Sequence, residues 1–114
     1  MSDRTNSDET CVCFKVPYTD LTYQRELGMT KGYAEVSVLV CPSCGQHWLH
    51  YFYEQEAFTA SGRWYLGALT PEQLSALTVA NAKSMLEGLA WYYYGGSFYD
   101  GRIGKASGEI KFVP

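Results

Sequence analysis

Residues 32–58 read GYAEVSVLVCPSCGQHWLHYFYEQEAF and contain the clearest periodicity of the chain. Alternate residues from Ala34 to Val40 fall on one face of an extended backbone, so residues 32–41 predict a strand. Residues 46–58 predict a second long strand with bulky side chains on both faces, which is typical of a central strand covered on both sides. Cys44-Gly45 supplies the turn between the two strands.

The sequence that follows predicts a third strand, after which the spacing of apolar residues changes from that of a strand to that of a helix. Residues 63–69 predict a strand after a turn at Ser61-Gly62, which gives an antiparallel meander. TPEQLSAL (70–77) has a capping threonine, a proline at the first helical position and a glutamine three residues after the cap, so it predicts a short helix. Thr78 can cap a second and longer helix, the main one, over residues 79–94, which keep helical spacing and stop at Gly95-Gly96. The predicted fold class is α+β: an antiparallel β-meander packed on its valine face against one main helix in the C-terminal half.

The remaining segments are less regular. Residues 1–10 are polar and predict a disordered N-terminus, while residues 11–114 predict a single domain. Residues 11–16 form a short β-type run, residues 21–27 suggest a turn or short strand, and the C-terminal tail suggests a hairpin or an added edge strand. We expect four apolar residues of the tail to continue the core: Ile103, Ile110, Phe112 and Val113.

Four cysteines occur as two close pairs, Cys11-x-Cys13 and Cys41-x-x-Cys44. The second pair lies in Cys-Pro-x-Cys-Gly, a zinc-knuckle sequence in which the glycine permits a left-handed backbone after the second thiolate. Residues two apart on a strand point to the same side, so the first pair could share an ion with the second. We therefore predict a zinc-ribbon-like Cys₄ site with structural zinc as the cofactor.

Other interpretations of the cysteines stay open. They could form two disulfides or remain four thiols, and His47 could replace one cysteine as a metal ligand. A site closed by four cysteines leaves no position for water, so the sequence predicts no catalytic metal and no enzyme. Glu54 and Glu56 share a strand face near Arg63, which is more typical of a solvated strand end with an ion pair than of acid–base catalysis.

Composition and charge narrow the class of partner. The chain has 114 residues, a net charge of −3, 16% aromatic residues and 18% charged residues. An acidic chain lacks the clustered Lys and Arg that phosphate backbones require, which argues against a nucleic-acid partner and favours a basic protein. The start of the chain lacks an apolar signal segment, and no apolar run approaches the ~18–20 residues that span a membrane. We therefore expect a cytoplasmic protein that does not bind membranes.

The run CPSCGQHWLHYFYEQEAFTASGRWY, the TPEQL helix, WYYYGGSFYDG and the final SGEI together resemble small bacterial immunity proteins of polymorphic or contact-dependent toxin systems. The resemblance covers about residues 40–110 and implies a non-enzymatic protein that neutralises a cognate toxin, such as a nuclease, by direct binding. The alternative is a zinc-ribbon nucleic-acid-binding or regulatory module. From the acidic and aromatic residues we predict these partner contacts: Tyr53, Glu54, Glu56, Tyr99 and Asp100.

Overall fold

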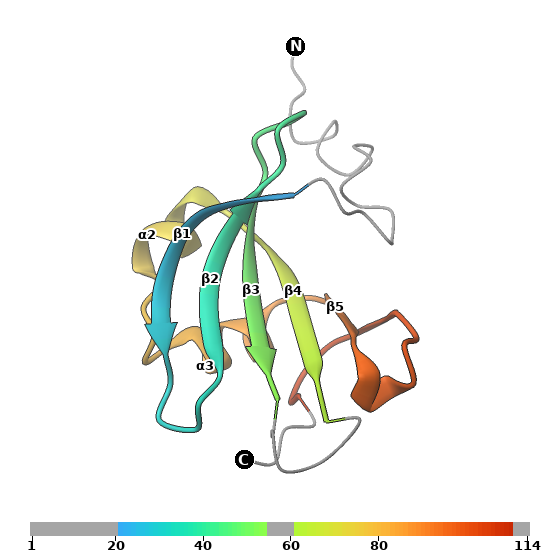
Figure 1. Cartoon of the computed structure of the whole chain (residues 1–114). Coiled ribbons are helices and arrows are strands. Elements are labelled where there is room, and N and C mark those ends of the chain that lie inside the picture. Colours follow the sequence, from blue (N-terminus) through green and yellow to red (C-terminus); the bar gives the residue numbers. More distant parts are fainter. Residues whose placement is uncertain (1–20, 55–60, 111–114) are drawn as a thin grey trace.

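The structure is a computed structural model that describes residues 21–54 and 61–110. Its centre is a six-stranded antiparallel sheet in which the strands follow one another in chain order (Figure 1). The strands are β1 (Thr22–Met29), β2 (Glu35–Val40), β3 (His47–Tyr53), β4 (Arg63–Leu69), β5 (Tyr92–Gly95) and β6 (Gly104–Ala106). Between them lie helices α2 (Pro71–Ala76) and α3 (Ala82–Gly88) and the short 3₁₀ helix η2 (Ser97–Tyr99). The α+β class and the antiparallel meander are confirmed.

The three strands predicted from residues 32–69 form the middle of this sheet. Strand β4 has the predicted bounds, whereas β3 ends at Tyr53, earlier than predicted, and residues 55–58 lie outside the described part. The β2–β3 turn is closed by hydrogen bonds from Cys41 N to Gln46 O (2.9 Å) and from Gly45 N to Cys41 O (2.8 Å). Gly45 has the left-handed backbone that its place after Cys44 predicted, with φ of +79°.

The alternating valines build the core on the helical side of the sheet. Ala34, Val36 and Val38 are fully buried, and Ala82 and Leu86 of α3 are buried in the same cluster. Figure 1 shows both helices on this one side, behind the sheet in that view. Burial of a valine or leucine side chain stabilises the fold by about 1.5–3 kcal/mol, so the valine periodicity accounts for the sheet–helix packing.

The opposite face of the sheet also carries a buried cluster, as the bulky residues on both faces of β3 predicted. Trp48 is fully buried there and stacks on Tyr93 of β5, with ring centroids 6.1 Å apart. Leu39, Cys41 and Leu66 complete this second cluster. Because β3 pairs with β2 on one side and β4 on the other, its central position is confirmed.

The prediction of one main helix over residues 79–94 is wrong. Helix α3 has only seven residues, and Leu89 leaves it with an extended backbone (φ −72°, ψ 156°). Residues 92–94, predicted as the end of that helix, lie in β5 (Tyr92–Gly95). The aromatic run therefore alternates between faces: Tyr92 and Tyr94 join the helix-side cluster, and Trp91 and Tyr93 join the other one. Tyrosine and tryptophan favour strands, and pairing with β4 fixes that choice.

Of the two predicted helix starts, only the first begins a helix where it was predicted. Helix α2 begins with the expected capping box, in which Gln73 N donates to Thr70 Oγ1 (3.1 Å) and Thr70 N donates to Gln73 Oε1 (2.8 Å). Thr78 makes the same reciprocal pair with Asn81, but this closes a turn ahead of α3 rather than starting a helix at residue 79. Over residues 21–54 and 61–110 the helical layer therefore consists of two short helices, where one short and one long helix were predicted.

The edges of the sheet are formed by segments with weak sequence signals. The turn or short strand expected at residues 21–27 is the eight-residue strand β1, with irregular register at two points. The tail supplies the edge strand β6, and Ile110 is buried as expected. Ile103 is 37% exposed, so its assignment to the core is wrong, while Phe112 and Val113 lie outside the described residues. Within residues 21–54 and 61–110, no helix has the length and apolar character needed to cross a membrane.

Candidate functional site

Two segments far apart in the sequence meet at the start of β4. The chain leaves β5 at Gly96 and crosses residues 62 and 63, where Phe98 N donates to Gly62 O (2.8 Å) and Gly62 N donates to Ser97 Oγ (3.1 Å). Gly96 has φ of +113°, a conformation that favours glycine, and it lies against the backbone of residues 62 and 63. This crossing places η2 beside the end of β3. Most of the predicted partner contacts belong to these two elements or to the residues that follow them.

A buried arginine lies at the centre of this meeting point. Arg63 is only 3% exposed, and its guanidinium lies over two aromatic rings, 4.0 Å from the centroid of Phe98 and 4.9 Å from that of Tyr53. Phe98 itself is 45% exposed. A guanidinium over an aromatic face attracts the ring electrostatically, and the attraction is stronger away from water. Arg63 therefore holds an exposed phenylalanine in one position on the surface.

Two residues with exposed carboxylates lie next to the elements that meet here, Glu54 at the end of β3 and Asp100 at the end of η2. Glu54 follows the last residue of β3, and its carboxyl group lies beside Gly62. Asp100 follows η2 in a left-handed conformation (φ +59°), and its backbone N–H closes the turn onto Ser97 O at 3.0 Å. Aspartate tolerates that conformation better than most residues. Phe98, Glu54 and Asp100, supported by Arg63, form what we call the Phe98 surface.

The predicted partner contacts do not share one environment. Glu54 and Asp100 are exposed, and Tyr99 is half-buried with its hydroxyl 2.9 Å from that of Tyr65. Tyr53 is only 3% exposed, so it supports Arg63 from the core. Glu56 lies outside the described residues. The structure thus brings four of the five predicted residues to one end of the sheet and adds Arg63 and Phe98 to them.

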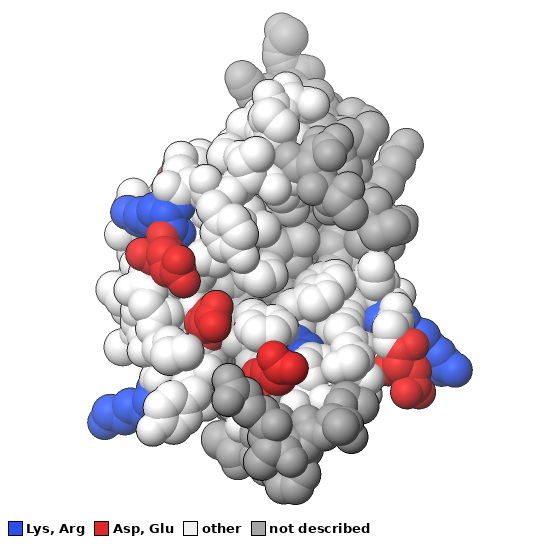
Figure 2. Space-filling model, viewed as in Figure 1, with Lys and Arg blue, Asp and Glu red and all other residues white. Residues whose placement is uncertain are grey.

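Charge is sparse on the face of the sheet opposite the helices. Figure 2 shows this face largely uncharged, with acidic and basic groups in small separate clusters. No continuous basic stripe of the kind that follows a phosphate backbone crosses the visible described surface.

The cysteines of the knuckle lie at the opposite end of β3. Cys41 is fully buried and Cys44 half-buried, both in the β2–β3 turn. Cys11 and Cys13, the other two predicted ligands, lie outside the described residues. Over the part of the chain that is described, no three His, Cys, Asp or Glu side chains come together as a metal site, so His47 does not complete one with Cys41 and Cys44. Two thiol ligands of the right spacing on a tight turn remain compatible with half of a zinc site.

Comparison of the chain with protein-family models, curated proteins and solved structures found no match.

Proposed function

We propose that this chain is a non-enzymatic protein-binding protein, and specifically an immunity protein that neutralises a cognate bacterial toxin by direct binding. The observation that carries the proposal is the Phe98 surface, in which a 45% exposed phenylalanine rests on a buried guanidinium. Interfaces depend on a few aromatic or arginine anchors, and an anchor that is already ordered loses less entropy on binding. The proposal places the protein in the cytoplasm, where it would meet a toxin that has entered the cell.

The charges around the anchor favour a basic partner. Glu54 and Asp100 are exposed beside Phe98, and the whole chain has a net charge of −3. Opposite charge accelerates encounter and suppresses binding of acidic partners, whereas the aromatic anchor determines how long the complex lasts. A basic nuclease domain would satisfy both requirements. The scattered charge in Figure 2 gives less support to the alternative nucleic-acid-binding module.

Phe98→Ala is expected to weaken binding of the toxin-like product encoded next to this chain's gene by about 10- to 100-fold, mainly through faster dissociation. Asp100→Lys should instead slow association by about 3- to 10-fold at low salt, with a smaller effect at high salt. Biolayer interferometry on the purified pair separates the two rates. Tyr33→Ala is the matched control because Tyr33 is also an exposed aromatic (73%) but lies in the β1–β2 turn.

Equal affinities of wild type, Phe98→Ala and Asp100→Lys would overturn the Phe98 surface as the interface. The immunity function itself would be contradicted if no neighbouring gene encoded a toxin-like domain. The nucleic-acid alternative predicts salt-dependent retardation of DNA or RNA, which the proposal expects to be absent even at low salt.

We further propose that zinc is held by Cys41 and Cys44 together with Cys11 and Cys13, as a structural ion. The tight turn and the left-handed Gly45 support the Cys41–Cys44 half of this site. A metal bound by four thiolates would link the segment that carries Cys11 and Cys13 to the end of the sheet and supply no chemistry of its own.

Purified full-length protein is therefore expected to contain about one zinc per chain by elemental analysis, and Cys44→Ser should lose most of it. Ser43→Ala, in the same turn, should retain the metal. A thiol assay on protein denatured with a chelator and without reductant should detect all four cysteines. Protein without metal would contradict the site, and the thiol count would then distinguish disulfides from free thiols.

A further inference from the structure

A small pocket lined by tyrosines lies on the helical side of the sheet, where β4, β5 and β6 meet the segment after β6. It has a volume of about 230 Å³. Its lining includes Tyr65, Tyr92, Tyr94, Tyr99, Ser107 and Glu109. Tyr65 and Tyr92 are 1% and 2% exposed, whereas Tyr94 and Tyr99 are half-buried and Ser107 and Glu109 exposed. The pocket therefore has a buried aromatic floor and a rim that is open to solvent.

The rings are fixed at steep angles to one another. Tyr65 meets Tyr92 at 82° and Tyr99 at 89°, with centroids 5.9 and 6.5 Å apart, and Tyr94 lies 4.5 Å from Tyr99 at 46°. The hydroxyls of Tyr65 and Tyr99 are 2.9 Å apart. The Tyr94 ring lies on Gly104, its partner in β6, where a side chain would collide with it. These contacts order the aromatic walls before any ligand binds.

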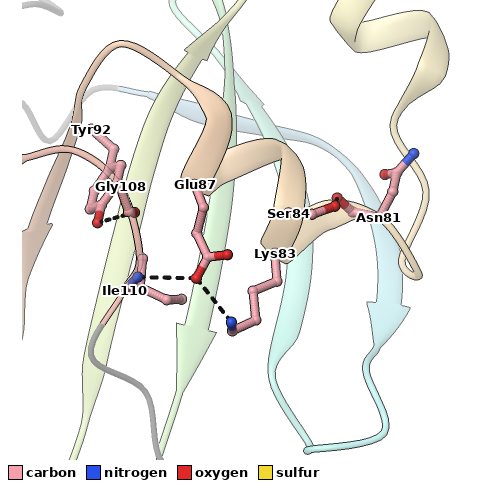
Figure 3. A network of polar contacts seen from close by, with 7 residues as sticks. All are labelled: Asn81, Lys83, Ser84, Glu87, Tyr92, Gly108 and Ile110. Carbon is pink, nitrogen blue, oxygen red and sulfur yellow. Dashed lines mark hydrogen bonds and ion pairs between the residues drawn. The ribbon is translucent and has the colours of Figure 1, made fainter.

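Polar contacts from α3 and β5 hold the open side of the pocket in place (Figure 3). The Tyr92 hydroxyl donates to Gly108 O (2.9 Å), and Ile110 N donates to Glu87 Oε2 (3.1 Å). Lys83 Nζ pairs with the same carboxylate oxygen at 2.9 Å. Residues 108 and 110 are thus anchored on both sides of Glu109, which leaves its exposed side chain at the rim.

The electrostatics of the pocket favour a cation. Burial raises the pKa of Tyr65, as does its hydrogen bond to Tyr99, and burial also raises the pKa of Tyr92, so these phenols stay neutral. Neutral aromatic rings present a negative face. Glu109 adds a carboxylate, and among the described residues no lysine or arginine lines the pocket. Arg63 is the cation whose charge acts on the pKa of Tyr65. Its guanidinium lies over the rings of Tyr53 and Phe98.

We propose that this tyrosine cage binds a quaternary ammonium group of a small organic cation. A volume of 230 Å³ is below the roughly 300–1,000 Å³ of pockets for whole drug-sized ligands, so it suits a head group. Methyl groups around a positive nitrogen fit apolar ring faces and carry a diffuse charge, which is the recognition mode of aromatic cages. Tyr99 connects the cage to the Phe98 surface, because its ring meets that of Phe98 edge-on with centroids 5.1 Å apart, but binding of a small cation does not require the proposed protein partner.

The test is titration of the full-length protein with choline, followed by calorimetry and by chemical shifts of the tyrosine rings. The neutral isostere 3,3-dimethylbutan-1-ol has the same shape without the charge. We expect choline to bind at least ~10-fold more tightly than this isostere. Glu109→Gln should weaken choline about 3- to 10-fold, and Tyr94→Leu about 10-fold or more, while Tyr94→Phe keeps the ring and should retain binding.

Tyr33→Leu removes an exposed tyrosine outside the cage and is expected to leave choline binding unchanged. Thermal unfolding of each variant shows whether it is folded. If Tyr94→Leu does not fold, Glu109→Gln and the comparison of choline with its isostere in wild type still decide the question. Equal binding of choline and the isostere would reduce the cage to an apolar cavity and overturn the proposal, as would absence of choline binding at millimolar concentration.

Discussion

Gly96→Ala is expected to lower the free energy of unfolding by about 3 kcal/mol or more. Gly96 has φ of +113°, and a Cβ there would lie 2.5 Å from Gly62 O and 2.8 Å from Arg63 Cα. Both contacts are with backbone, so a change of rotamer cannot relieve them and the crossing itself must move. The hydrogen bond from Phe98 N to Gly62 O depends on that crossing, so loss of stability and displacement of Phe98 should occur together.

Urea denaturation of wild type and variants measures the effect through the midpoint at constant m-value. Gly101→Ala is the matched control because Gly101 also has positive φ (+76°) but no heavy atom lies within 4 Å of the added Cβ. It should cost only about 1 kcal/mol, the backbone term alone. Equal losses for Gly96→Ala and Gly101→Ala would show that the close approach of residues 62 and 96 is absent.

The sequence predicted the fold well where the spacing of apolar residues matches either a helix or a strand, but not both. Residues 35–40 alternate small apolar and other residues, and a helix would scatter the same valines around its surface, so only a strand was consistent. The start of α2 was equally clear because its capping residues bond to each other locally. Neither inference needed knowledge of distant parts of the chain.

The wrong prediction for residues 89–94 has the opposite cause. Trp91 and the three tyrosines after it are bulky at every position, so they satisfy a helical and a strand pattern equally. The choice is made by pairing with β4, in which Tyr65 lies opposite Tyr94 and Leu66 opposite Tyr93. Such pairing joins segments almost thirty residues apart, and single-sequence periodicity contains no information about it.

In the candidate site, too, the sequence predicted what local residues determine and missed what contacts between distant segments determine. Glu54 at a strand end and Asp100 in an Asp-Gly turn could be expected at the surface from local sequence. Arg63 could not be expected in the core, because arginine is mostly exposed unless it finds partners. Its partners Tyr53 and Phe98 reach it only because the chain crosses at Gly96, 34 positions after Gly62.

Acidification from pH 6.5 to pH 4 is expected to lower the free energy of unfolding by about 2–3 kcal/mol through His50 alone. Burial lowers the pKa of His50 from 6.5 to about 4. The residue lies on β3 between Ser37 of β2 and Leu66 of β4, and the Tyr23 ring meets it edge-on with centroids 6.2 Å apart. None of these neighbours carries a negative charge that could stabilise an imidazolium.

The direction of the effect follows from proton binding. Above pH 6.5 the imidazole of His50 is neutral in the folded and in the unfolded chain, so its full contribution to the free energy of unfolding is present. Between pH 6.5 and pH 4 the unfolded chain binds a proton that the folded chain excludes. The free energy of unfolding therefore falls as the pH falls. Because carboxylates titrate in part of this range, the measurement is the difference between urea-unfolding series of wild type and His50→Gln at pH 7, 6, 5 and 4. His50→Gln should lose about 2–3 kcal/mol less than wild type across the series. Parallel curves for wild type and His50→Gln would show that His50 is open to water and that this face of β3 is not buried as described.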